Sequence, residues 1–353
     1  GVMAERGHRN SGVTATDVAR RAGVSQSTVS PGLNPNGKVK VQEEARQRVL
    51  QAARELGYRP NAIAQTMISG RSKIVGVVVS DYFNVFYYQM LQLLTNRLMA
   101  AGLQAMVFSS PPRSDINELL QRFYRYQVDG VIVTSSALSH HVTEQGIQRG
   151  VPVVLINGYL PDMGINAVQS DQFGSGILMA DYLVGVGHRR FAYVSSENSP
   201  HRNYMPRQEG FLEGLRRHGV DTCRVIPGGY SYQSGLEVGE SLAREADMPD
   251  AIFCSGDWNA MGVLDALRRH SQREIGREVS VTGYDTPILT GLEAYSITGL
   301  TQDMDGLCSD AVELLETLME DPERPPQLLT RPMHLTIRSS SRPLPREMEQ
   351  KKG

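Results

Sequence analysis

Short apolar runs alternate with amphipathic stretches along the chain from residue 74 onward. The runs predict buried strands at 74–79, 104–108, 130–133, 151–156, 191–194, 251–253 and 279–282. Helical spacing of apolar residues marks the stretches between them, and strands that alternate with helices form parallel, doubly wound sheets. About 270 residues of this pattern predict two such sheets facing each other across a cleft. Ligands of these folds bind at the carboxyl ends of the strands.

Residues 14–33 show a different pattern, that of two short helices joined by a turn. Thr14, with Asp17 three residues later, is typical of a capped helix start, and Gly23 suits a helix end. Ser25 is a good N-cap for a second helix that begins at Gln26. We therefore predict an all-α helix-turn-helix in which the first-turn side chains of the second helix point outward.

A third helix is predicted from about Val41 to Leu56, with Gly57 as its stop. Residues 62–68 are enough for only one or two further turns. A helix this short is unstable alone, so the segment should become ordered only with a partner. Residues 1–13 and 339–353 are polar and aperiodic, which predicts a disordered arm and a disordered tail.

The charge distribution divides the chain near the same place. Residues 1–73 hold 12 Lys and Arg against 5 Asp and Glu, and residues 74–353 hold 24 against 33. A basic head on an acidic body is expected of a nucleic-acid-binding module joined to another domain.

The three cysteines (Cys223, Cys254 and Cys308) are far apart and suit a reducing compartment. With no apolar signal segment and no membrane-length run, we expect a cytoplasmic protein without membrane contact.

Two motifs carry a specific resemblance. Residues 14–30 read Thr-x-x-Asp-Val-Ala-x-x-Ala-Gly-Val-Ser-x-x-Thr-Val-Ser, and residues 55–64 read Glu-Leu-Gly-Tyr-Arg-Pro-Asn-x-x-Ala. Both resemble the headpiece of the LacI/GalR family of bacterial transcriptional regulators. The resemblance implies a nucleoid-associated homodimer that places two recognition helices in adjacent major grooves of a near-palindromic operator. It also implies that the hinge, residues 61–68, folds in the minor groove, where Met67 wedges between base pairs.

The resemblance assigns contacts with double-stranded DNA to Thr14, Gln26, Ser27, Thr28, Ser30, Asn34, Tyr58, Asn61, Ala64 and Met67. One departure is Pro31-Gly32, where the family usually has Arg followed by Val or Ala. Pro31 would be the sixth helical residue, and an interior proline costs about 3 kcal/mol. We therefore expect a shortened or kinked recognition helix, with an operator preference or affinity unlike that of the commonest members.

The resemblance covers roughly residues 14–340, through motifs that include Gly187-His-Arg-Arg, Arg207-x-x-Gly-Phe and Val279-Ser-Val-Thr-Gly-Tyr-Asp. It implies a headpiece at 14–60, a hinge at 61–72 and a periplasmic-binding-protein-like effector domain at 73–338. The first lobe would hold about 73–169 and 301–331, and the second about 170–300 and 332–338. The residues that align with family effector contacts are Phe86, Tyr87, Asn157, Arg207, Tyr230, Asp257, Asp285 and Gln302.

These side chains suit a small effector such as a sugar, a sugar acid or a purine-like metabolite. Arg207 can donate two hydrogen bonds in a fork, and Tyr230 can stack on a sugar face or a base. Gly256 stands where sugar-responding members often have Asn, so the effector need not be a common hexose. Asn157 replaces a frequent Asp, which makes an anionic ligand easier to accommodate.

Three structural interpretations of these residues stay open. Arg207 and Asp285 either contact the effector or form only a salt bridge between the lobes. Tyr230 is either a ligand contact or ordinary surface. Asp257 either contacts the effector or caps a helix that begins at Trp258.

Other classes of function are less consistent with the sequence. Gly174-Ser-Gly176 lacks a third glycine, no P-loop or nucleophile motif occurs, and His140-His141 lies in a predicted loop without nearby carboxylates. We therefore expect no catalytic residue, no cofactor and no metal site.

A periplasmic receptor would need a signal peptide and would not need a headpiece. The remaining alternative to a ligand-controlled repressor is a sensor or solute-binding protein whose headpiece is impaired by Pro31-Gly32. The tail lacks the leucine heptads of tetrameric members, which favours a dimer.

Overall fold

The chain folds into two compact units, residues 1–72 and 73–353, and each is described by itself. The computed structural model describes residues 12–34, 39–62, 66, 69–80, 85–110, 116–134, 139–158, 164–196, 204–285 and 287–345. The side chain of Asp285 lies outside this description, although its backbone ends a strand.

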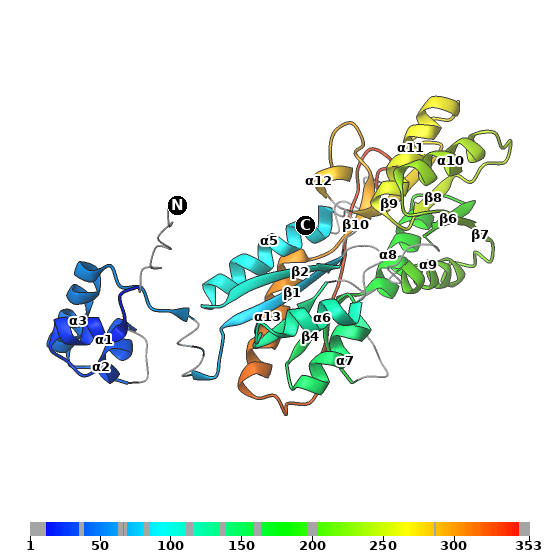
Figure 1. The fold of residues 1–353 in the computed structure, drawn as a ribbon. Coiled ribbons are helices and arrows are strands. Elements are labelled where there is room, and N and C mark those ends of the chain that lie inside the picture. The colour runs from blue at the N-terminus through cyan, green and yellow to red at the C-terminus, as the bar shows by residue number, and fades with distance from the viewer. Residues whose placement is uncertain are drawn as a thin grey trace, which may run out of the picture. The chain divides into compact units, whose positions relative to one another are not determined.

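The first unit is a helical headpiece built on three helices (Figure 1). They are α1 (Ala15–Ala22), α2 (Gln26–Leu33) and α3 (Glu43–Leu56). Each helix contributes a fully buried valine to one small core, namely Val18, Val29 and Val49. The predicted helix-turn-helix is confirmed, because α1 and α2 are separated only by residues 23–25.

The starts of the helices follow the sequence signals with two differences. Thr14 and Asp17 form the predicted capping box, each accepting a hydrogen bond from the backbone amide of the other. Ser25 is the N-cap residue of α2, but its hydroxyl lies 2.7 Å from the Thr28 hydroxyl and caps no backbone amide. The third helix begins at Glu43 rather than at Val41.

Pro31 does not end the recognition helix early. α2 continues through Pro31 to Leu33, so of the two predicted outcomes the shortened helix is wrong, and the kinked helix stays a prediction. Gly32 is buried against α3, and a Cβ atom there would lie 3.2 Å from Cγ1 of Val49. This close packing holds the last turn of α2 in place, while Pro31 removes only the one hydrogen bond that its own nitrogen would have donated.

Helical backbone recurs in the predicted hinge. Ala62, Thr66 and Ser69 are helical, and the Thr66 hydroxyl donates to the Ala62 carbonyl oxygen at 2.8 Å. The Gly70 amide donates to the Thr66 carbonyl oxygen at 2.9 Å. Two predicted DNA contacts in this segment, Ala64 and Met67, lie outside the described residues.

The second unit contains two six-stranded sheets. We call the sheet β11-β5-β4-β3-β1-β2 and its helices the first lobe, and all its neighbouring strands are parallel. Its strands are β1 (Ile74–Ser80), β2 (Gln104–Ser110), β3 (Gly130–Val133), β4 (Val153–Ile156), β5 (Asn166–Ser170) and β11 (Leu328–Arg331). Its helices are α5 (Val85–Ala100), α6 (Ile116–Tyr124), α7 (Ser139–Arg149) and α13 (Met304–Glu320).

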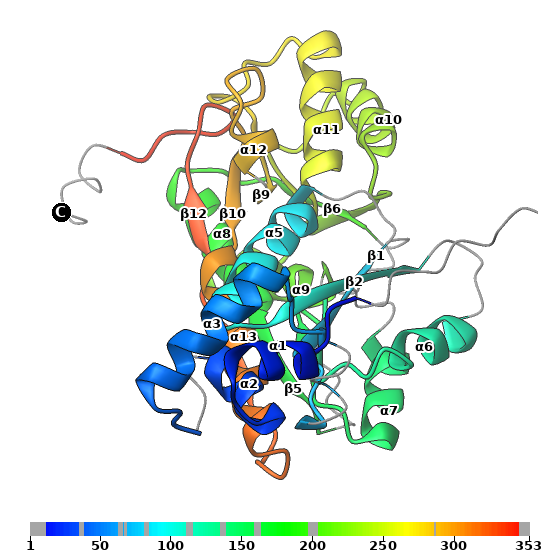
Figure 2. The same ribbon diagram turned by 60° about the vertical axis from the view of Figure 1, so that its left-hand side comes forward.

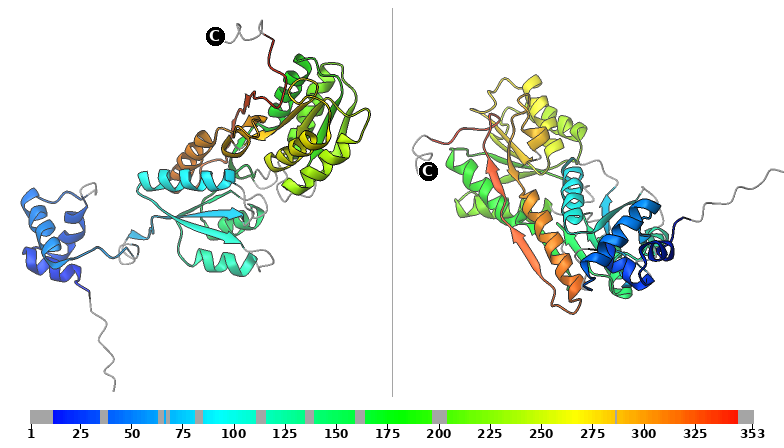
Figure 3. Two further views of the ribbon diagram at one scale, coloured as in Figure 1. Left: turned by 90° about the horizontal axis from the view of Figure 1, so that it is seen from above. Right: turned by 90° about the vertical axis from the view of Figure 1, so that its left-hand side faces the viewer.

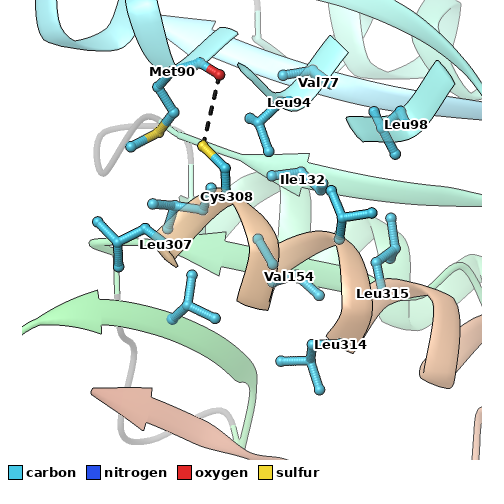
Figure 4. Packing of buried hydrophobic residues seen from close by; sticks show 14 of the residues in the cluster. Val77, Met90, Leu94, Leu98, Ile132, Val154, Leu307, Cys308, Leu314 and Leu315 are labelled. Carbon is cyan, nitrogen blue, oxygen red and sulfur yellow. Dashed lines mark hydrogen bonds between the residues drawn. The ribbon is translucent and has the colours of Figure 1, made fainter. Parts of the chain in front are cut away.

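Helices cover both faces of this sheet, and successive strand residues enter opposite cores. Val77 packs with α5 and α13, whereas Val78 packs with residues of α6 and α7. α5 and α13 lie side by side (Figure 3), and the Cys308 thiol on α13 lies 3.8 Å from the Met90 carbonyl oxygen on α5 (Figure 4). Burial raises the pKa of the Cys308 thiol to about 12, so this cysteine serves packing rather than chemistry.

The second lobe is the sheet β12-β10-β9-β8-β6-β7 with its helices, and only β12 runs antiparallel to its neighbour. Its strands are β6 (Phe191–Ser195), β7 (Cys223–Pro227), β8 (Ala251–Cys254), β9 (Ser280–Asp285), β10 (Thr298–Thr301) and β12 (His334–Thr336). Its helices are α8 (Gln172–Gly185), α9 (Tyr204–Arg217), α10 (Tyr232–Ala243), α11 (Asp257–His270) and α12 (Pro287–Thr290). α10 and α11 pack side by side (Figure 2). The predicted fold class is confirmed.

The chain passes between the two sheets three times. It does so from β5 into α8, from β10 into α13, and from β11 into β12. The sequence patterns missed β5, β7, β10, β11 and β12. β5, β10 and β12 are short and partly polar, while β7 and β11 are exposed strands at sheet edges. None of the five carries the continuous apolar run that marks a strand buried on both faces.

The first part of the predicted disordered tail is ordered, which corrects that expectation for residues 339–345. Ser340 and Ser341 are buried. The Ser340 hydroxyl donates to the Val281 carbonyl oxygen at 2.6 Å and accepts from the Thr298 amide at 2.8 Å. The polar composition of this segment therefore serves buried hydrogen bonding against the second lobe.

Candidate functional site

The α2 surface presents the residues predicted to read DNA bases. Gln26, Ser27 and Ser30 are exposed. Thr28 is half-buried, because its hydroxyl faces the N-cap serine of the same helix. Small polar side chains on the first turns of a recognition helix are the groups that reach base edges in the major groove.

The other predicted DNA contacts of the headpiece divide into exposed and packed residues. Asn34, at the end of α2, and Asn61 are exposed. Thr14 is exposed, and its hydroxyl lies 2.7 Å from Oδ2 of Asp17. Tyr58 packs partly against the headpiece core, so only part of its ring is accessible. The described headpiece also carries more basic than acidic residues, at Arg20, Arg21, Lys40, Arg46, Arg48, Arg54, Arg59 and Arg71 against Asp17, Glu43, Glu44 and Glu55.

The predicted effector residues share one position in the fold. Each follows the carboxyl end of a strand, or lies in the first turn of the helix after it. In the first lobe this holds for Asn157 after β4 and for Phe86 and Tyr87 after β1. In the second lobe it holds for Arg207, Tyr230 and Asp257, and for Gln302 after β10. The backbone of Asp285 also lies at a strand end, that of β9. This is where open parallel sheets bind their ligands.

Arg207 is the fixed centre of the second-lobe residues. It is only 4% exposed, and its guanidinium carbon lies 3.4 Å from the centre of the Tyr284 ring. Its Nε donates to Oε1 of Gln172 at 3.1 Å, and another guanidinium nitrogen donates to the Ser255 carbonyl oxygen. Gln172 in turn donates to the Tyr284 hydroxyl at 2.8 Å. These contacts hold the guanidinium over an aromatic face, and a fixed guanidinium suits forked recognition of oxygen atoms.

Tyrosines from both lobes interact electrostatically with this guanidinium. Burial raises the pKa of Tyr87, the neighbouring Tyr284 adds to the increase, and Arg207 opposes it. Burial likewise raises the pKa of Tyr230, with further increases from Asp257 and Tyr87. Because Tyr87 belongs to the first lobe and the others to the second, these electrostatic interactions link residues of the two lobes. We name Tyr87, Arg207, Tyr230, Asp257 and Tyr284 the guanidinium cluster.

Gly256 makes room for Tyr230. A Cβ atom on Gly256 would lie 3.0 Å from Cε2 of Tyr230. The missing side chain therefore lets the Tyr230 ring pack close to the first turn of α11. Tyr230 is half-buried, and whether it contacts a ligand stays a prediction.

Asp257 lies in the first turn of α11. The helix begins at Asp257 rather than at Trp258, and Oδ1 of Asp257 accepts from the Trp258 amide at 2.8 Å. The carboxylate is 4% exposed at a helix N-terminus, where backbone amides stabilise negative charge. The predicted cap is wrong, because the N-cap residue is Gly256, whose amide donates to Oδ1 of Asn259 at 3.0 Å. The predicted effector contact of Asp257 stays a prediction.

Asn157 and Gln302 form a separate group. Nδ2 of Asn157 donates to Oε1 of Gln302 at 2.8 Å, and the Ser170 hydroxyl donates to the same oxygen at 2.7 Å. Oδ1 of Asn157 accepts from the Ser170 amide at 3.0 Å. These bonds join the ends of β4, β5 and β10, two of which lead into the other lobe. The structure thus gives this predicted pair a role in tying the crossing segments together.

Phe86 belongs to the buried core of the first lobe. It is 6% exposed and meets the Tyr87 ring edge-on at a centroid distance of 5.3 Å. This packing suits a role in positioning Tyr87, and the predicted contact of Phe86 with the effector stays a prediction. Because the Asp285 side chain is not described, its pairing with Arg207 stays a prediction.

Three residues of the site escaped the sequence reasoning. Gln172 follows β5, a strand that the apolar pattern missed, so its place at a strand end was hidden. Ser255 contacts Arg207 through its carbonyl oxygen, and a backbone contact leaves no trace in the residue type. Tyr284 lies in the motif at 279–285. Its position directly before Asp285, a predicted effector contact, was the available signal.

Two absences apply to the described part of the chain. No group of three or more His, Cys, Asp or Glu residues there could hold a metal ion. His140 and His141 lie in α7 rather than in a loop, and Nδ1 of His140 is 3.8 Å from Oε2 of Glu144, which corrects both expectations for this pair. None of the described helices combines the length and apolar character needed to cross a membrane.

A helix-turn-helix unit followed by a two-lobed α/β unit with a polar cluster at the strand ends defines a DNA-binding regulator with a sensor domain. Residues 14–61 match the bacterial regulatory proteins of the lacI family, and residues 180–341 match the periplasmic binding protein-like domain. Both matches, together with the relatives below, make the chain similar to the LacI family of bacterial transcriptional regulators.

Individual proteins agree with this assignment. Catabolite control protein A of Priestia megaterium is 28% identical over 333 residues, covering 94% of this chain and 99% of that protein. The lac repressor dimer bound to operator and the anti-inducer ONPF has a TM-score of 0.80 and 25% identity, covering 94% of this chain and 100% of that one. The transcriptional regulator CelR in complex with cellobiose has a TM-score of 0.69 and 27% identity, covering 93% and 100%. These relatives are regulators and not enzymes.

Proposed function

We propose that this chain is a repressor that binds a near-palindromic operator in the bacterial nucleoid as a homodimer, with an affinity set by a small effector. The observation that carries the proposal is the guanidinium cluster, which joins both lobes in a chain that also presents Gln26, Ser27 and Ser30 on an exposed recognition helix. One chain thereby combines an exposed recognition helix with a polar cluster at the strand ends.

The cluster favours an effector with several oxygen atoms and a flat or apolar face. Arg207 offers forked donors beside an aromatic face, and Tyr87 and Tyr230 offer rings and hydroxyls. Sugars, sugar acids and purine-like metabolites share this chemistry, and the CelR neighbour was solved with cellobiose. A panel of these three classes in a thermal-shift assay would identify the class by the ligand that raises Tm most.

The control of DNA binding follows from the position of the cluster between the lobes. A ligand held by Tyr87 on one side and Arg207 on the other binds one lobe arrangement better than another, and so shifts the equilibrium between them. The segments tied by Asn157, Ser170 and Gln302 would transmit that shift to the first lobe, to which the hinge is joined at residue 73. A hinge that unfolds cannot wedge the operator.

The first lobe carries a surface that fits a second copy of the chain. β2 is an edge strand, and on it and the adjacent α5 three apolar side chains are strongly exposed: Tyr88, Met99 and Val107. Exposed apolar groups that cluster on one face mark an interface. The lac repressor neighbour was solved as a dimer.

The double variant Tyr88→Glu and Val107→Glu is expected to convert the dimer to a monomer, because each chain would then bury two carboxylates in the interface. Sedimentation velocity measures the change. Tyr126→Glu, which places the same charge on an exposed residue of the same lobe, is the control and should stay dimeric. A double variant that remains dimeric would place the interface elsewhere.

The alternative function is a small-molecule sensor or solute-binding protein whose headpiece is impaired by Pro31-Gly32. The intact span of α2 and its packing through Gly32 favour the repressor. In vitro selection from random duplex DNA, run with the unmodified protein and with Pro31→Arg, separates the two. Enrichment of a near-palindrome by the unmodified protein supports the repressor, whereas enrichment only by the variant would support the sensor.

A further inference from the structure

The backbone takes a left-handed conformation where the first lobe begins. Lys73 is the first residue of the second unit and directly precedes β1, and its φ is 56°. Residues other than glycine adopt this conformation rarely, because Cβ then crowds the following carbonyl oxygen. The Lys73 side chain is exposed, so its own packing does not explain the conformation. A residue strained in this way persists only where its surroundings hold it.

Asp129 holds the backbone of Lys73 from a neighbouring strand. Oδ2 of Asp129 accepts from the Lys73 amide at 2.8 Å, across 56 positions of the chain. The Lys73 carbonyl oxygen accepts from the Gln104 amide, also at 2.8 Å. Asp129 directly precedes β3 and Gln104 begins β2, and these two strands flank β1 in the sheet. Both backbone groups of Lys73 are therefore tied to the first-lobe sheet.

The second lobe contains the same kind of bond without the left-handed residue. β8 pairs with β6 there, as β3 pairs with β1 in the first lobe. Asp250 directly precedes β8, and its Oδ1 accepts at 2.9 Å from the amide of Arg190, which directly precedes β6. The φ of Arg190 is not positive. The sheet alone therefore does not explain the conformation of Lys73, whereas the chain that arrives from the hinge does.

β1 connects this junction with the effector residues. Its amino end follows Lys73, and its carboxyl end leads to α5, whose first turn carries Tyr87 of the guanidinium cluster. We propose that Asp129 is a positioning residue for the hinge: by holding Lys73 on the sheet, it makes the start of the hinge follow the first lobe. The proposal rests on the proposed function, in which the effector shifts that lobe. Without the Asp129 carboxylate, local opening at Lys73 would absorb the shift before it reached the operator.

Limited digestion of the full-length protein with trypsin tests the junction without DNA, because trypsin cleaves after lysine. Asp129→Ala is expected to raise the rate of cleavage after Lys73 at least about tenfold. Loss of a hydrogen bond to a carboxylate favours local opening by about this factor, and cleavage follows the population of the opened form. Asp129→Asn, whose side-chain oxygen can still accept, should raise the rate less. Mass spectrometry identifies the cut, and cleavage after Arg71 serves as the internal reference.

The second measurement is the ratio of the operator Kd values with and without the effector identified by thermal shift. Asp129→Ala should reduce this ratio to less than about twofold and leave the Kd for the effector itself unchanged. Asp129→Asn should retain most of the ratio of the unmodified protein. A residue that served only general stability would not show this rescue by the conservative variant.

Asp250→Ala is the matched control, because it removes the corresponding bond in the second lobe. It should change neither the cleavage rate after Lys73 nor the Kd ratio. An unchanged cleavage rate in Asp129→Ala would overturn the proposal, as would an unchanged Kd ratio or equal effects of Asp129→Ala and Asp250→Ala. The same operator Kd with and without effector in the unmodified protein would instead overturn the proposed function, and the coupling with it.

Discussion

Arg207→Ala is expected to weaken effector binding at least about 100-fold and to leave operator affinity without effector unchanged. The substitution removes the forked donor from the site and also leaves the Ser255 carbonyl oxygen and Oε1 of Gln172 without their buried partner. Hydrogen bonds to charged groups contribute about 1.5–3 kcal/mol each, and about 2.7 kcal/mol corresponds to 100-fold in affinity. The stacking support that Tyr284 gives the guanidinium is lost at the same time.

Isothermal titration with the ligand identified by thermal shift measures this loss. Arg217→Ala on the same helix is the control, because Arg217 is exposed and its ion pair with Glu213 lies on the surface. Exposed ion pairs contribute little, so this variant should bind the effector normally. Equal affinities for Arg207→Ala and the unmodified protein would remove the guanidinium cluster from the effector site.

Gly32→Val is expected to abolish specific operator binding while the sensor domain keeps its effector response. Even a Cβ atom at this position would lie 3.2 Å from the Val49 side chain, and valine adds two further methyl groups toward a fully buried residue. Overpacking of this kind costs about 1–3 kcal/mol. A unit of about 60 residues rarely has more than about 3–5 kcal/mol of stability, so much of the headpiece would unfold.

Circular dichroism melts and a mobility-shift assay check this prediction. Gly12→Val is the matched control, because a Cβ atom on Gly12 would meet nothing within 4 Å. Pro31→Ala provides a second comparison: it restores a backbone donor inside α2 and should raise headpiece stability. Normal operator binding by Gly32→Val would show that the packing of α2 on α3 through Gly32 is not what maintains the recognition helix.

The hydrophobic pattern predicted the architecture because the main strands are covered by helices on both faces. Val77 and Val78 enter different cores, so a strand such as β1 must be apolar throughout and stands out in the sequence. Edge strands are under no such constraint, and β7 and β11 were missed. The capping box of Thr14 and Asp17 could also be predicted from the sequence, since a cap is formed by residues close together in the chain.

The details that depend on packing between distant segments could not be predicted. The effect of Pro31 depends on the neighbouring Gly32 meeting Val49 on another helix, which the local cost of a proline does not reveal. The bonds of Asn157 with Gln302 join residues that are 145 positions apart. Ser340 is a polar residue that follows β12, yet it is buried against the second lobe. Pairing partners, rather than residue types, decide these cases.

The central claim is that one chain couples effector binding to operator binding. The most direct measurement is the Kd for the selected near-palindromic duplex, by fluorescence anisotropy, with and without the identified effector, for the unmodified protein and Arg207→Ala. We predict a change of about 5–150-fold for the unmodified protein, the range typical of allosteric coupling, and no change for the variant. The same Kd with and without effector in the unmodified protein would contradict the account.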